Sequence, residues 1–112
     1  MKLEEITIER LDEAYRKTGT KPGREFMDRH AMEICPLAVL GRELGCHWGE
    51  VFDGDRELAS QFAEGFDGIR PKANVTSIAY ELGRLVAKHY RAKGFDVGMT
   101  GRIGDAIPKK LS

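Results

Sequence analysis

The sequence lacks several features by which classes of protein are recognised. It has only two cysteines among its 112 residues. Its 18 Lys and Arg residues are balanced by 18 Asp and Glu residues. Small secreted domains are usually rich in disulfides, so this low cysteine content favours reduced thiols and a cytoplasmic protein. A balanced charge removes the overall attraction to phosphate that most nucleic-acid-binding domains have. A nucleic-acid partner is therefore not favoured.

Long apolar runs are also missing, which makes a membrane partner unexpected. The first residues, Met1 to Glu5, do not resemble the apolar part of a signal peptide. The 41% of hydrophobic and 32% of charged residues are ordinary for a globular protein rather than a disordered one. We therefore expect one folded domain over residues 1–112.

Apolar residues recur at helical spacing in several segments, which predicts a mainly α-helical bundle of about four helices. Thr7 can cap the first helix, Pro36 fits the first turn of the second, and Asp55 can cap the third. The fourth helix is expected over residues 75–93, capped by Asn74. Glycines follow the expected helix ends: Gly19, Gly45, Gly68 and Gly94.

The fourth helix has the clearest apolar stripe, so we expect it to organise the core. The stripe consists of Val75, Ile78, Ala79, Leu82, Leu85, Val86 and Tyr90. Gly65 and Gly83 lie inside predicted helices, where a glycine costs roughly 1 kcal/mol relative to alanine. We therefore expect these two glycines to face one another where two helices approach closely.

Two segments lack a clear helical pattern. Pro22 and Gly23 are typical of a tight turn, so the chain is expected to bend within residues 20–24. The apolar residues up to position 34 fit two short strands around residues 28–30 or a poor helix, and we favour a small hairpin or irregular segment. These residues are Phe26, Met27, Ala31, Met32 and Ile34. Glycines in residues 95–112 predict a glycine-rich, loosely ordered C-terminal tail.

Four potential zinc ligands occur within a short stretch of the sequence: His30, Cys35, Cys46 and His47. Their spacing lacks the short pairs that let one turn present two ligands, so we expect no metal and no cofactor. Cys35 would lie at the N-terminus of the second helix, where the helix dipole can activate a thiol. No base is placed beside it by the sequence, so packing is the favoured role.

Acidic residues between positions 53 and 64 partly match a calcium-binding loop. Leu58 stands where that loop needs glycine, so the segment is expected to be the start of the third helix instead. Residues 98–104 are glycine-rich but follow a helix and match no phosphate-binding pattern. We therefore expect neither calcium nor phosphate to bind.

Residues 37–53 resemble a helix-turn-helix motif. Counted from Leu37, the small residues Gly41 and Gly45 and the aliphatic Val51 stand at positions 5, 9 and 15. The second helix would present Glu50 and other acidic side chains to the major groove, where they would repel phosphate. A DNA-binding regulator is therefore the alternative interpretation rather than the first.

Three short segments resemble short uncharacterised bacterial and phage-type proteins. The segments are Cys35-Pro36-Leu37, Gly65-Phe66-Asp67-Gly68 and Tyr80-Glu81-Leu82-Gly83-Arg84. Together they extend over about the middle half of the chain. The resemblance implies helical packing and no particular activity.

The favoured interpretation is a small non-enzymatic protein-interaction module, because no residue set satisfies the requirements of a catalytic site. The partner is expected to be another protein or a second copy of the chain, and a phage-type regulator or inhibitor is a close variant. A thiol- or metal-dependent enzyme centred on Cys35 is the least favoured alternative. The expected interaction surface consists of Trp48, Phe52, Phe66 and Tyr90.

Overall fold

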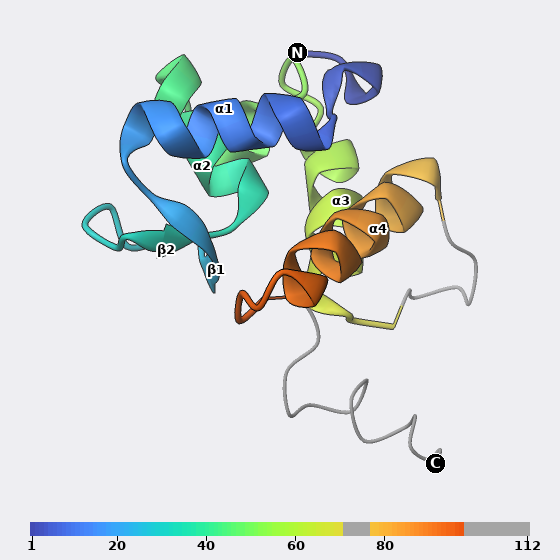
Figure 1. Cartoon of the computed structure of the whole chain (residues 1–112). Coiled ribbons are helices and arrows are strands. Elements are labelled where there is room, and N and C mark those ends of the chain that lie inside the picture. Colours follow the sequence, from blue (N-terminus) through green and yellow to red (C-terminus); the bar gives the residue numbers. More distant parts are fainter. Residues whose placement is uncertain (71–76, 98–112) are drawn as a thin grey trace. The chain divides into compact units, whose positions relative to one another are not determined.

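The computed structural model describes residues 1–70 and 77–97 (Figure 1). Over these residues the chain is mainly helical, with four α-helices and a two-stranded sheet, which confirms the predicted fold class at this level. The chain divides into two compact units, Met1–Ser60 and Gln61–Ser112. One domain over residues 1–112 stays a prediction.

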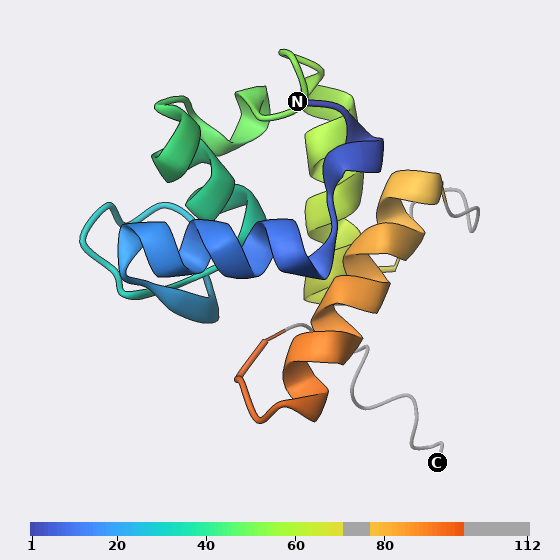
Figure 2. The same ribbon diagram turned by 45° about the horizontal axis from the view of Figure 1, so that its top comes forward.

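The first unit is built on two helices that pack against each other, α1 (Ile8–Thr18) and α2 (Pro36–Leu44) (Figures 1 and 2). Thr7 caps α1 by accepting a hydrogen bond from the Arg10 backbone N–H at 3.0 Å, and Gly45 ends α2 with a φ of 78°. Both ends agree with the sequence. The α1 and α2 residues that fill this core are Leu11, Ala14, Tyr15, Leu37, Val39 and Leu40.

Ion pairs join the two helices beside this apolar contact. Glu43 of α2 pairs with Arg10 at 2.7 Å and with Lys17 at 3.6 Å, both from α1. The Glu43 side chain is mostly buried, so these pairs are less screened by solvent than surface pairs. They fix which face of α1 meets α2.

A small sheet lies between the two helices in the sequence. Its strands are β1 (Lys21–Glu25) and β2 (Glu33–Ile34), and they pair in parallel with an irregular register. The predicted turn at residues 20–24 is therefore wrong, because this segment is extended and forms β1. A hairpin is also excluded, since hairpin strands are antiparallel.

A short turn and the start of the next helix complete the first unit. The 3-10 helix η2 (Trp48–Glu50) follows α2, and Val51 and Phe52 after it are buried in the core. Asp55 then caps α3 (Arg56–Asp67) by accepting from the Leu58 N–H at 3.0 Å, as predicted.

The second unit contains most of α3 and the helix α4 (Ile78–Ala92). Ser77 caps α4 by accepting from the Tyr80 N–H at 3.1 Å. The described helix therefore begins at Ile78 with Ser77 as its cap, whereas the sequence predicts a start at Val75 with Asn74 as cap. Asn74 and Val75 lie outside the described residues. Sequence rules alone did not distinguish two polar residues that can both cap a helix.

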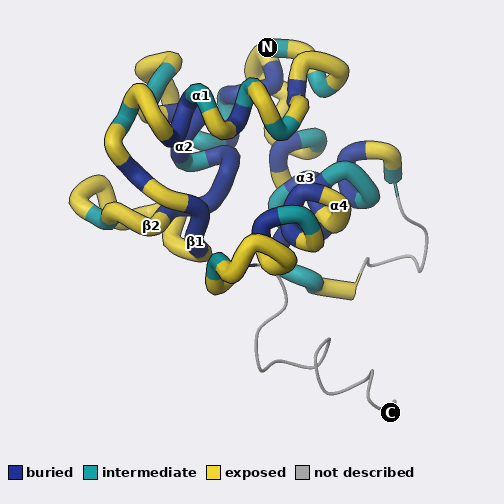
Figure 3. The backbone as a smooth tube through the Cα atoms, in the orientation of Figure 1, coloured by how far each residue is buried: buried dark blue, intermediate teal, exposed yellow. Residues whose placement is uncertain are grey.

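The buried face of α4 shares Ala79, Val86 and Tyr90 with the predicted stripe and differs from it at the other positions. Its core residues are Ala79, Tyr80, Gly83, Val86, Ala87 and Tyr90. Ile78 and Leu85 are exposed instead, and the alternation along the helix is visible in Figure 3. The predicted stripe combines residues of two apolar faces of α4, and the face that contains the small residues packs in the core.

α3 and α4 meet at two glycines. A methyl group built on Gly65 would overlap the carbonyl oxygen of Tyr80, and one built on Gly83 would overlap the carbonyl oxygen of Phe62. Each glycine therefore lies against the backbone of the opposite helix, as the sequence predicts. Because a Cβ would not fit, the helices approach more closely than larger residues would permit.

The chain after α4 returns to the core over a few residues. The Phe95 and Tyr90 rings meet edge to face with their centres 5.9 Å apart, and Val97 is fully buried. The rest of the predicted tail, residues 98–112, lies outside the described residues.

We expect Gly83→Ala to destabilise the fold, because its new methyl must displace the α3 backbone. Overpacking of this kind costs about 1–3 kcal/mol, which exceeds the gain in helix propensity of about 1 kcal/mol. Denaturant unfolding measures the change, with Arg91→Ala at an exposed position of α4 as the control. Equal stability of Gly83→Ala and the natural chain would contradict the close crossing.

Alkaline unfolding provides a second check on this unit. Burial raises the pKa of Tyr80 above its ordinary value of 10.0, and the Tyr80 hydroxyl donates to the Ile69 carbonyl at 2.5 Å. The folded state therefore holds this proton more tightly than the unfolded state, so its contribution to stability is lost as the pH rises above 10.0. Tyr80→Phe should make the stability fall less steeply in that range. Parallel pH profiles of the two proteins would count against this.

Candidate functional site

The aromatic residues expected to form an interaction surface belong mostly to the core. Phe52, Phe66 and Tyr90 are each at most 2% exposed, and Trp48 is half-buried. A side chain that is already buried by its own chain has almost no surface to offer a partner. These three aromatic residues therefore belong to the core, and Trp48 is the residue of this set that keeps an appreciable exposed surface.

The potential zinc ligands are not brought together. Cys35 is buried at the N-terminus of α2, where its sulfur accepts from the Ala38 N–H at 3.4 Å, whereas Cys46 is exposed. His47 Nδ1 accepts from the Gly49 N–H at 3.0 Å. Within residues 1–70 and 77–97, no group of three His, Cys, Asp or Glu side chains could hold a metal ion.

The acidic segment near the start of α3 forms a helix start, not a calcium loop. The Asp55 carboxylate accepts from the Leu58 N–H, and the helix has begun at Arg56. Asp53 accepts from the Met1 amino group at 3.0 Å. The carboxylates therefore serve the fold here. The glycine-rich residues 98–104 lie outside the described residues.

The helix-turn-helix alternative lacks its second helix in the structure. Residues 47–53 contain η2, which is three residues long, followed by the buried Val51 and Phe52. A recognition helix must reach into the major groove with several exposed side chains. One turn of 3-10 helix does not provide that reach.

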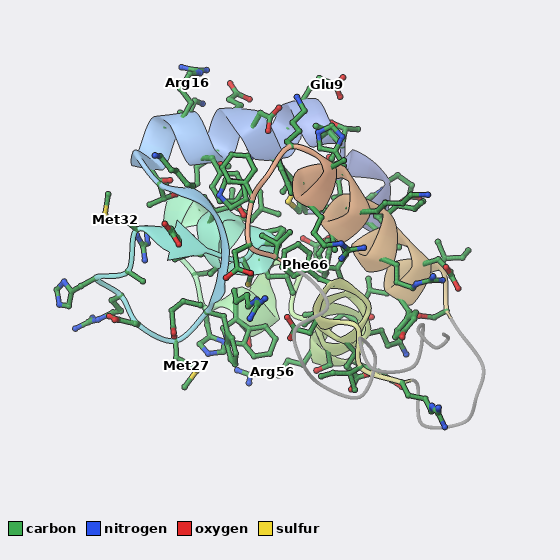
Figure 4. The ribbon with its side chains drawn as sticks, turned by 60° about the horizontal axis from the view of Figure 1, so that its bottom comes forward. Glu9, Arg16, Met27, Met32, Arg56 and Phe66 are labelled. Carbon is green, nitrogen blue, oxygen red and sulfur yellow. The ribbon has the colours of Figure 1, made fainter. Side chains whose placement is uncertain are left out.

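A different surface stands out in the first unit, on the loop between β1 and β2. Phe26, Met27 and Met32 are 43%, 68% and 59% exposed there. Figure 3 shows this loop almost entirely in the exposed colour, and in Figure 4 the side chains of Met27 and Met32 project away from the ribbon. We call these three residues, at positions 26–32, the apolar loop.

The apolar loop is held at many points by hydrogen bonds. The Glu25 carboxylate accepts from the backbone N–H groups of Met27 and Asp28, each at 2.9 Å. Asp28 in turn accepts from the His30 N–H at 2.8 Å, and Arg42 of α2 donates to the Ala31 carbonyl at 3.2 Å. A loop fastened in this way presents its side chains in a defined arrangement.

The base of the loop rests on Trp48. The Phe26 and Trp48 rings meet edge to face, with their centres 5.4 Å apart, which is a favourable aromatic geometry. Trp48 can lie there because Gly41 of α2 allows close approach: a methyl on Gly41 would lie 2.6 Å from the Cys46 carbonyl oxygen. Trp48, one of the residues expected from the sequence to form an interaction surface, thus supports Phe26 of the apolar loop.

The charged side chains on the loop have different roles. The carboxylates of Glu25 and Asp28 already accept hydrogen bonds from the loop backbone. Arg29 and His30 are exposed at the loop tip. The surface therefore combines apolar side chains with exposed charged groups of both signs.

A scan of protein-family models and searches of curated proteins and solved structures found no match to this chain. Among the described helices, none has the length and apolar character needed to cross a membrane.

The sequence pattern assigns no role to Phe26, Met27 and Met32, because their segment fits either short strands or a poor helix. The signal that the sequence does carry is their position: apolar residues bracket the polar residues 28–30, while the preceding Pro22 and Gly23 lie in β1. The exposure of these three side chains depends on how β1 and β2 pair, and no local sequence pattern reveals that pairing. A methyl on Gly23 would lie 2.6 Å from the Glu33 backbone, so that pairing requires glycine there.

The two thiols should differ sharply in reactivity. Because Cys46 is exposed and Cys35 is buried, we expect alkylation of the native chain to modify Cys46 more than about a hundredfold faster, since Cys35 must await an opening of the structure. Mass spectrometry of the modified peptides measures both rates, with Cys46→Ser isolating Cys35. Fast modification of Cys35 would instead favour the thiol-enzyme alternative.

Proposed function

We propose that this chain is a non-enzymatic protein-interaction module that binds its partner through the apolar loop. The observation that carries the proposal is the exposure of Phe26, Met27 and Met32 on a loop that hydrogen bonds hold in place. Because hydrogen bonds hold the loop backbone in place, a partner can bury these side chains with little loss of backbone conformational entropy.

The two methionines suit this role by their chemistry. Methionine is unbranched and polarisable, so it adapts to the shape of an apolar pocket and is common at surfaces that bind proteins. Phe26 is less exposed than either methionine and contacts Trp48. It therefore provides a rigid base from which the two flexible side chains extend.

The size of the apolar contribution limits what the loop can do alone. Full burial of a Met or Phe side chain stabilises by about 1.5–3 kcal/mol, and these three are already partly covered. They supply a few kcal/mol together, whereas micromolar binding needs about 8 kcal/mol. The partner must therefore also contact polar groups next to the loop.

Arg29 and His30 are exposed at the tip of the same loop, and they indicate the chemistry of the partner. A complementary surface has an apolar pocket for the methionines and carboxylates at its edge to meet Arg29. Binding of this kind would also allow the chain to act as a regulator or inhibitor, by occupying a surface that its partner needs for another contact.

Photo-crosslinking tests the proposal even when the partner is unidentified. A photoreactive residue is placed at Met27 or Met32, and as a control at Arg16, which is also exposed but lies on α1 (Figure 4). In cells that make the protein, positions 27 and 32 should each give the same discrete adduct, and position 16 should not.

Competition separates a specific partner from chance encounters. An excess of the natural chain should abolish the adduct, whereas Met27→Ser/Met32→Ser should compete at least about tenfold less well, because it loses most of the apolar contact. The absence of an adduct at both positions, or equal competition by both proteins, would refute the proposal. Circular dichroism confirms that the variant is folded.

A further inference from the structure

Helix α4 carries a second apolar stripe that its own unit does not bury. Ile78 and Leu85 are 80% and 61% exposed, and Leu82 between them is half-buried. The spacing of four and then three residues places all three on one line along the helix. We call Ile78, Leu82 and Leu85 the α4 ridge, and His89 is the next position on the same line.

Helical geometry divides α4 into three faces. At about 100° per residue, the ridge lies about 120° around the helix from the core face that contains Gly83 and Val86. The third face is charged and consists of Glu81, Arg84, Lys88 and Arg91. A further helix could therefore pack on the ridge while α4 keeps its contact with α3.

We propose that the ridge pairs with the ridge of a second copy of this chain, in antiparallel orientation. A twofold axis between positions 82 and 85 places Leu82 opposite Leu85 of the other copy, and Ile78 opposite its His89. Spacings of three and four residues are those by which paired helices interlock their side chains. The inference concerns a surface other than the apolar loop and does not depend on it.

The charges beside the ridge select the orientation. Glu81 and Lys88 both border the ridge on its charged side. In the antiparallel pair, Glu81 of one copy approaches Lys88 of the other, and the symmetry makes this contact twice. A parallel pair would place Glu81 and Lys88 of the two copies on opposite sides of the seam, so these favourable contacts would be lost. Glu81 also pairs with Arg84 at 3.0 Å, but that contact is exposed and weak.

The ridge is short, so the pair should be weak. From position 78 to 89 it extends about 16 Å at the rise of an α-helix, and each copy contributes three apolar side chains. Stable protein interfaces bury about 1,200–2,000 Å², more than such a ridge supplies. We therefore expect a dimer that dissociates in the micromolar to millimolar range.

Sedimentation equilibrium of the full chain, from about 10 µM to 1 mM, measures this association. The natural chain should pass from monomer to dimer, and Leu85→Lys should weaken association at least about tenfold by placing a charge in the contact. Leu85 is exposed, so this substitution should leave the fold intact. Met27→Ser/Met32→Ser should dimerise normally, which separates failure of this inference from failure of the proposed function.

Charge reversal tests the orientation. Glu81→Lys and Lys88→Glu should each weaken the dimer, by about three- to tenfold, because each creates two like-charged contacts. An equimolar mixture of the two variants should form mixed dimers that are tighter than either variant alone. Arg91→Glu, on the same helix but away from the ridge, is the control and should have little effect.

Three results would overturn the inference. One is a natural chain that stays monomeric at 1 mM, as it would if another segment of the chain covered the ridge. The second is a dimer that Leu85→Lys does not affect. The third is a mixture of Glu81→Lys and Lys88→Glu that associates no better than the single variants.

Discussion

Close contact between backbones at glycine residues is the constraint on which the rest of this structure depends. In the second unit, α3 and α4 cross at Gly65 and Gly83, where neither helix has room for a Cβ. In the first unit, Gly41 allows η2 to fold against α2, and Gly23 allows β1 to approach β2. A small chain buries a smaller fraction of its surface than a large one does. Close crossings offset this because they increase the contact area of each helix.

This use of glycine explains why apolar side chains remain outside the core. The aromatic residues Phe52, Phe66 and Tyr90 fill the interior, while small residues form much of the α4 contact face. Because the core face of α4 is made from Ala79, Gly83 and their neighbours, its larger aliphatic residues lie on another side. In the first unit, the strand pairing at Gly23 likewise leaves the apolar loop outside. Both exposed surfaces thus follow from the packing.

Sequence rules succeeded where the cause is local. Thr7, Pro36 and Asp55 mark helix starts because a cap acts on the next few residues. They failed where distant segments decide the outcome. Pro22 and Gly23 look like a turn but form a strand, since β2 lies alongside. The core face of α4 was recoverable from the spacing of its small residues at 79, 83 and 87, whereas the exposure of the loop at 26–32 was not, because it depends on the same strand pairing.

The central claim is that the apolar loop is a binding surface, and methyl NMR tests it most directly. With the methyl groups of methionine and isoleucine labelled, the Met27 and Met32 signals should lose intensity in an extract of cells that make the protein. The signal of Ile34, which is fully buried, should change far less. An excess of unlabelled chain should restore the two methionine signals, because it occupies the partner. Unchanged signals, or equal losses at all three residues that unlabelled chain does not reverse, would contradict the account.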